Sequence, residues 1–151
     1  MMISELDITK QLVKVIQDHL NEYLPEGYTI DPGQVILDFP DVDKMPYSTC
    51  IYVHPDYSEA EELTTCSDEV NFRLSCFVVC KRDTQTNLTE KYFAYYNAVY
   101  YLLRNNTSLE GTIDETKIIS VDFYPAIEGN PNVRGSEISL NTIFAKDFKG
   151  E

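Results

Sequence analysis

The chain has 151 residues, of which 43% are hydrophobic and 12% aromatic, and its 12 lysines and arginines stand against 25 aspartates and glutamates, a formal net charge of −13. A chain of this length most simply forms one domain, and its apolar content excludes a disordered tail. The negative charge argues against a protein that holds nucleic acid through phosphate contacts, because such contacts need a basic surface.

The first residues, MMISELD, have neither a basic start nor an unbroken apolar run, so we expect no signal peptide. No later stretch approaches the roughly 18 consecutive apolar residues of a membrane-spanning helix, so we expect no membrane partner. The four cysteines are then expected to be free thiols of a reducing cytoplasm.

Two of these cysteines, Cys76 and Cys80, lie in a stretch that alternates like a strand. Four residues of strand span about 13 Å, too far for two thiolates to share one zinc ion. Alternation instead places both on one face with apolar neighbours, namely Val70, Phe72, Leu74 and Val78. We therefore expect buried thiols and no metal site.

The first half of the chain predicts one helix and three strands. Apolar residues at helical spacing predict a helix over residues 5–24, with Ser4 as its cap and Pro25-Glu26-Gly27 as its stop. Strands are expected at 35–39, 48–54 and 69–82, the last two forming a large hairpin. An acidic loop at 40–46 and a polar, mobile loop at 55–67 separate them.

Asn87 and Glu90 fit a capping-box pattern, so a second helix is expected to begin after Asn87 and to end near Arg104. Between Tyr92 and Leu103 only Asn97 lacks an apolar or aromatic side chain. A helix that is apolar on all sides must be covered on more than one side. One face is expected on the sheet, and the other against the first helix or a second subunit.

The last third predicts two more strands, at 117–124 and 137–146, on either side of a turn-rich loop at 125–135. In the second of these strands Ile138, Leu140 and Phe144 alternate with Ser139, Asn141 and Ile143, which predicts one buried face. The complete order is α-β-β-β-α-β-β. It predicts a single-domain α+β fold with a mainly antiparallel sheet and two helices packed on one of its faces.

No motif fixes a reaction. His19 lies at the border of the first helix's apolar stripe, and His54 precedes Pro55 and Asp56, but no nucleophile elbow accompanies either histidine. Asp38, Asp41 and Asp43 lack the spacing of an EF-hand loop, and no phosphate-binding glycine loop occurs. The expectation is a protein that is not an enzyme, with no catalytic, cofactor or metal site.

Charge is unevenly distributed. Between Ile36 and Val70 there are nine acidic residues and a single basic one, Lys44. This segment is either a solvated rim that keeps the protein soluble or a surface that repels polyanions. The loop at 125–135, which contains Arg134, is likewise either an ordinary turn or a projection that docks onto a partner.

The succession of an opening helix, a long hairpin, a tyrosine-rich helix and two closing strands resembles the tail terminator proteins of long-tailed bacteriophages. The most similar part is the closing block, residues 120–125 (SVDFYP) and 137–142 (EISLNT). The resemblance implies a small α+β subunit that forms a ring, usually a hexamer, on the end of the tail tube. This ring stops tube growth and joins the tail to the head.

The resemblance also implies partners and surfaces. The partners would be further copies of the chain, the tail tube protein and a head-completion protein, first in the bacterial host cytoplasm and then in the virion tail. DNA would pass through the ring without stable binding. The expected subunit or tube interface consists of Tyr96, Tyr100, Tyr101, Glu128, Asn130, Asn132 and Arg134. The expected acidic lumen consists of Asp38, Asp41, Asp43, Asp56, Glu59, Glu61 and Glu62.

Three alternatives remain open at this point. The first is a head–tail connector or another minor tail or capsid component of similar size. The second, from another class, is a binding module with a small-ligand pocket between sheet and helices, lined by the tyrosines of the second helix. The third, a small hydrolase, requires His19 or His54 to be indispensable.

Overall fold

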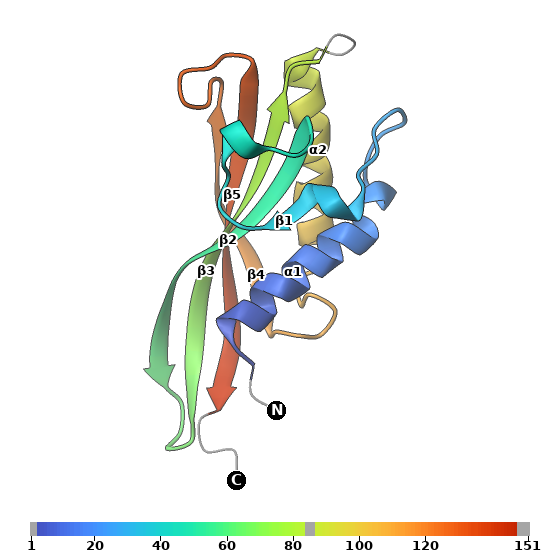
Figure 1. Ribbon diagram of the computed structural model, residues 1–151. Coiled ribbons are helices and arrows are strands. Elements are labelled where there is room, and N and C mark those ends of the chain that lie inside the picture. Colours follow the sequence, from blue (N-terminus) through green and yellow to red (C-terminus); the bar gives the residue numbers. More distant parts are fainter. Residues whose placement is uncertain (1–2, 84–86, 148–151) are drawn as a thin grey trace.

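The computed structural model describes residues 3–83 and 87–147, which form one five-stranded sheet and two α-helices (Figure 1). Short 3-10 turns at Leu20–Glu22, Pro32–Gln34 and Val42–Lys44 join them. The elements follow in the order α1 (Glu5–His19), β1 (Val35–Leu37), β2 (Thr49–Glu62), β3 (Ser67–Lys81), α2 (Leu88–Arg104), β4 (Glu115–Tyr124) and β5 (Val133–Asp147). The predicted order α-β-β-β-α-β-β is confirmed.

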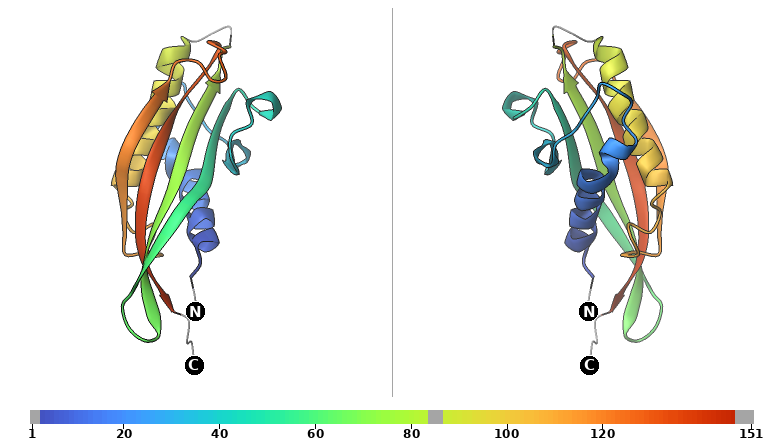
Figure 2. Two further views of the ribbon diagram at one scale, coloured as in Figure 1. Left: turned by 90° about the vertical axis from the view of Figure 1, so that its left-hand side faces the viewer. Right: turned by 90° about the vertical axis from the view of Figure 1, so that its right-hand side faces the viewer.

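The sheet has the strand order β1-β2-β3-β5-β4. Only the short β1 runs parallel to its neighbour, and the remaining pairs are antiparallel. Both helices lie on one face of this sheet, and the two views of Figure 2 show that face from behind and from the front. The predicted fold class is therefore confirmed. Neither described helix has the length and apolar content needed to cross a membrane.

The helix α1 starts where the sequence predicts. Ser4 Oγ accepts a hydrogen bond from the backbone N–H of Asp7 at 3.2 Å, and the Asp7 carboxylate accepts one from the N–H of Ser4 at 2.9 Å. This reciprocal capping box satisfies two donors that the first turn leaves free. The α-helix ends at His19, earlier than the predicted residue 24, because the chain tightens into the 3-10 turn at Leu20–Glu22.

The main core lies between the helices and the sheet. Every second residue of β3 points into it, so Cys76 and Cys80 are buried beside Phe72 and Leu74 as predicted. On β5 the predicted apolar face is confirmed as well, since Ile138, Leu140 and Phe144 join the same cluster. A smaller cluster on the opposite face is formed by Val42, Cys50, Tyr52, Val79 and Val133.

The predicted mobile loop at residues 55–67 is wrong. β2 continues to Glu62 and pairs with β3 as far as Glu62↔Asp68, so the hairpin extends beyond α1 (Figure 1). The outer half of β2 carries mostly polar side chains on both faces, so the alternation that marks a half-buried strand is missing there. Pro55 is tolerated because β1 ends at Leu37↔Val53 and leaves that side of β2 without a neighbour.

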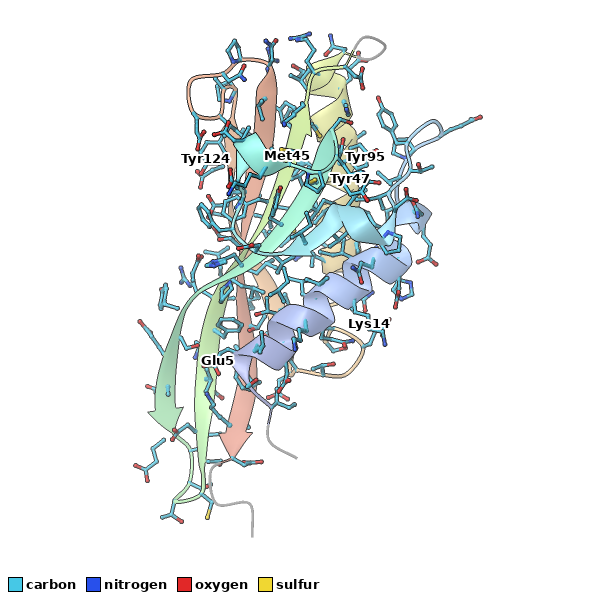
Figure 3. The ribbon with its side chains drawn as sticks, in the orientation of Figure 1. Glu5, Lys14, Met45, Tyr47, Tyr95 and Tyr124 are labelled. Atoms are coloured by element: carbon cyan, nitrogen blue, oxygen red, sulfur yellow. The ribbon has the colours of Figure 1, made fainter. Side chains whose placement is uncertain are left out.

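The extended hairpin is joined to the helix layer by Glu5. Its carboxylate accepts hydrogen bonds from Ser58 Oγ at 2.8 Å and from Lys146 Nζ at 2.6 Å. Figure 3 shows Glu5 at the start of α1, beside the strands of the hairpin. One side chain thus connects α1 with β2 and β5.

Candidate functional site

Aromatic side chains form a continuous surface along α2 and the last residues of β4. We call it the aromatic ridge and define it as Phe93, Tyr96, Tyr100, Tyr101 and Phe123. Phe123 stacks on Phe93 with ring centroids 5.1 Å apart and meets the Tyr96 ring edge-on, also at 5.1 Å. Tyr101 is 58% exposed and Phe123 is 43% exposed. Large apolar area therefore faces solvent at a site where rings already hold one another in place.

The aromatic ridge lies beside an open edge of the sheet. In the described part of the chain β4 has a neighbour, β5, on one side only. Ile119, at the bulge of this strand, is 45% exposed. An edge strand presents unpaired backbone N–H and C=O groups, which can pair with another chain. The ridge and the edge together have the character of a protein-binding surface.

Three of the seven predicted interface residues, Tyr96, Tyr100 and Tyr101, belong to this ridge. Phe93 and Phe123 were not among the predicted interface residues. Phe123 reaches the helix only through the packing of β4, which the sequence does not show. The other face of α2 is covered within the chain: Tyr95 donates a hydrogen bond to the carbonyl oxygen of Thr29 at 2.7 Å. The sequence predicts that α2 is covered on more than one side. Within the chain one side of the helix is covered, and the side that carries the ridge faces solvent.

The four other predicted interface residues lie in the loop after β4 and at the start of β5. Arg134 belongs to β5, not to the loop in which it was predicted, because β5 begins at Val133. Its Nη1 donates to Thr89 Oγ1 at 2.6 Å, and its Nε donates to the carbonyl oxygen of Pro131 at 3.2 Å. Asn132 Oδ1 accepts from Arg82 Nε at 2.9 Å. These two side chains hold the loop, whereas Glu128 and Asn130 are exposed.

The predicted lumen residues fall into two groups. Asp38, Asp41 and Asp43 surround the 3-10 turn beside the β1 edge, and the others lie on the outer half of β2. Alternation along β2 places Glu59 and Glu61 on the face opposite the helices and Glu62 on the helix side. Asp56, at the register shift of β2, turns to the Ser75 hydroxyl, 2.9 Å away.

A groove of about 370 Å³ lies on the sheet face opposite the helices. Its walls are the chain around Phe39 and the loop after β4, and its floor is formed by β3 and β5. The ligand pocket predicted between sheet and helices, with tyrosines of α2, does not match this groove, which takes its tyrosine, Tyr124, from β4. Figure 3 shows Tyr124 on the side of the sheet away from α2.

Hydrogen bonds organise one end of this groove. Ser75 Oγ lies 2.9 Å from Asp56 Oδ2 and 3.0 Å from Glu137 Oε2, and the Tyr124 hydroxyl donates to Glu137 Oε1 at 2.7 Å. Because the Glu137 carboxylate accepts a hydrogen bond from the protonated phenol, the pKa of Tyr124 is raised to about 12. Ser75 itself is fully buried. The sequence gives no sign that these four residues meet, because they come from four different strands: Asp56 from β2, Ser75 from β3, Tyr124 from the end of β4 and Glu137 from β5.

The two histidines are not brought together. His19 lies 2.7 Å from Glu110 Oε1 and 2.8 Å from Glu22 Oε2, and these carboxylates raise its pKa, Glu110 more strongly. The His54 ring packs edge-on against Phe39 with centroids 5.5 Å apart.

The cysteines and acidic residues were also checked as possible metal ligands. Burial raises the pKa of the Cys76 thiol to about 12 and that of Cys80 to about 11, while Cys66 is exposed in the turn of the hairpin. Residues 3–83 and 87–147 contain no group of three or more histidines, cysteines or carboxylates placed to hold a metal ion.

Comparison with known proteins gives a likeness of fold alone. Neither a known protein family nor a curated protein sequence matches the chain. A chain in the cryo-EM structure of the sheath/tube terminator of an extracellular contractile injection system, PVC, in the extended state, is similar with a TM-score of 0.55 at 11% identity. The match covers 99% of the present chain and 58% of that one, so the present chain spans little more than half its length. A chain of a native gene transfer agent virion is similar with a TM-score of 0.37 at 10% identity over 74% of the present chain and 78% of its own length.

Proposed function

We propose that this chain is a structural component of a phage tail or a related injection tube, and that it is not an enzyme. The more specific proposal is a tail terminator, a ring subunit that sits on the end of the tube, stops its growth and joins it to the head. The sequence resemblance and the fold of the chain from the sheath/tube terminator structure both support it.

The observation that carries the proposal is the aromatic ridge beside the open edge of β4. Exposed rings next to unpaired backbone groups are a liability for a monomer, since they favour association. A ring needs a heterologous contact, in which one surface meets a different surface of the next copy. The ridge and the β4 edge supply one half of such a contact. The outer half of β2, an open edge at the other side of the sheet, supplies the second half.

The strand directions suit this arrangement. β2 and β4 run antiparallel to one another across the sheet, because three antiparallel pairings separate them. The outer half of β2 in one copy therefore meets β4 of the next copy as an antiparallel pair, and the sheet continues from copy to copy. Repeated around a six-fold axis, this contact gives the proposed hexamer.

The same arrangement assigns a lumen. The face opposite the helices carries the acidic residues Glu59, Glu61, Glu69, Glu115 and Asp122, together with the basic residues Arg73, Lys81 and Lys117. Turned toward the channel, this face repels a passing polyanion and the helices stay outside. Of the predicted lumen residues, Asp38, Asp41 and Asp43 then lie at one end of the channel.

The first test is electron microscopy of tail tubes mixed with the purified protein. The wild type is expected to cap tube ends, and tubes assembled without it to grow to uncontrolled length. Phe123→Glu and Tyr101→Glu should fold normally by circular dichroism and fail to cap. Leu6→Glu is the matched control, because Leu6 is 52% exposed on α1, away from the ridge. Capping by both ridge variants, or no capping by the wild type, would overturn the proposal.

The lumen is tested separately. Glu69→Lys should leave capping intact, because Glu69 lies on β3 away from both open edges, and it should slow the passage of DNA, because the channel then attracts phosphates. The measurement is the rate of DNA ejection or the infectivity of particles carrying the variant. If rings form normally and infectivity is unchanged, the acidic face does not line the channel. The proposal that the chain forms a ring would not be affected.

A further inference from the structure

The groove on the sheet face opposite the helices is apolar along most of its length. Phe39 and Val42 form one wall, Tyr124 and Ile127 form the other, and Phe77 lies on the floor 5.3 Å from the Phe39 ring. Phe39 is 58% exposed. The groove therefore leaves apolar surface in contact with water, between two loops that come from opposite edges of the sheet.

The groove is also acidic. Asp56, Glu128 and Glu137 line it, and no lysine or arginine is among its described lining residues. None of the ion pairs in residues 3–83 and 87–147 includes any of these three carboxylates. An apolar groove with unpaired negative charge complements an apolar group that carries a positive one.

The geometry at the Ser75 end narrows the choice of cation. Ser75 has a single hydroxyl proton, so at any moment it donates to Asp56 or to Glu137, and one carboxylate oxygen keeps room for another donor. Both oxygens lie near one atom and are therefore less than about 6 Å apart, a span that the several N–H groups of a planar guanidinium can bridge. An ammonium group has no such fork.

We propose that this groove binds an arginine side chain of a partner protein, presented beside an apolar residue on a loop or an extended segment. The guanidinium contacts Asp56 and Glu137, and the apolar neighbour lies between Phe39 and Ile127. The hairpin of a second copy is a poor occupant, because the residues next to its turn, Glu61, Glu62, Asp68 and Glu69, are acidic and would meet an acidic groove. The inference does not depend on ring formation.

The test uses the full chain and two synthetic dipeptides, acetyl-phenylalanyl-arginine amide and acetyl-phenylalanyl-citrulline amide. Citrulline has nearly the shape of arginine and no charge. In ¹⁵N-labelled protein we expect saturable shifts of the Val79, Ile127 and Gly135 amides with the arginine peptide. The dissociation constant should be on the order of 1 mM for so small a ligand, and added salt should weaken it. The citrulline peptide should bind about ten-fold more weakly, since it lacks the charge-assisted hydrogen bonds.

Variants separate a built site from a generally acidic surface. Glu137→Gln is expected to weaken the arginine peptide about ten-fold and to keep the fold, because a glutamine oxygen still accepts from Tyr124. Glu115→Gln, on the same sheet face outside the groove, should leave binding unchanged. Equal binding of the two peptides, or equal weakening by both variants, would overturn the proposal. If the groove amides shifted when protein concentration alone was raised, a second copy of the chain would be the occupant of the groove. That result would also overturn the proposal.

Discussion

Replacing Gly135 by alanine is the most direct test of the sheet and of the groove floor. Gly135 is buried in β5, opposite Val79 on one side and Tyr124 on the other. A Cβ atom at this position would overlap the backbone carbonyl oxygen of Val78 and would lie 3.2 Å from Ile127 Cδ1. Since the obstacle is backbone held by strand pairing on both sides, it cannot rotate away.

The expected cost follows from this geometry. Overpacking a close-packed site costs about 1–3 kcal/mol, and the upper part of this range applies where the backbone has to move. For a chain of this size each kcal/mol lowers the melting temperature by roughly 2–4 °C, so Gly135→Ala should melt about 5–10 °C below the wild type. The displacement of β5 against Ile127 should also narrow the groove.

The assay is urea unfolding and differential scanning calorimetry of Gly135→Ala beside Gly33→Ala. A Cβ atom on Gly33 would meet the Tyr47 hydroxyl at 3.1 Å, but that side chain is 45% exposed and can turn away. The control should change the free energy of unfolding by no more than about 0.5–1 kcal/mol, in either direction. If Gly135→Ala were as stable as Gly33→Ala, the register of β5 against β3 described above would be incorrect.

Three further predictions concern single side chains. Glu5→Gln should lower the free energy of unfolding by about 1 kcal/mol at pH 7. This is the value of a charge-assisted hydrogen bond, reduced because the site is partly exposed to solvent. Burial opposes the shift, but the hydrogen bond from Lys146 helps to hold the folded-state pKa of Glu5 below 4.5. The stabilisation is therefore present above that pH and lost as pH falls through the folded pKa, so urea unfolding at successively lower pH should show a shrinking difference between the variant and the wild type. Glu137→Gln should return the pKa of Tyr124 from about 12 toward 10, measured by the ¹³C shift of the phenol carbon during alkaline titration; an unchanged pKa would contradict the hydrogen bond. Cys66 alone should react with Ellman's reagent in the native protein, and the three buried thiols only after unfolding; a second fast thiol would contradict their burial.

Local signals were sufficient for the helices and for the faces of the long strands. Ser4 and Asn87 cap their helices as predicted, because capping depends on residues three positions apart. The alternation in β3 and β5 identified the buried faces, since a strand that packs on helices must be apolar on that side. The uneven charge and the tyrosines of α2 were also visible in the sequence.

The tertiary structure alone decided which surfaces these residues form. The outer half of β2 is a strand because β3 satisfies its backbone, although its side chains lack a pattern. Phe123 joins the aromatic ridge, and Asp56 meets Glu137 at the Ser75 hydroxyl, across contacts between residues far apart in the sequence. Such meetings depend on strand order and register, which are set by the packing of the whole sheet and leave no local mark in the chain.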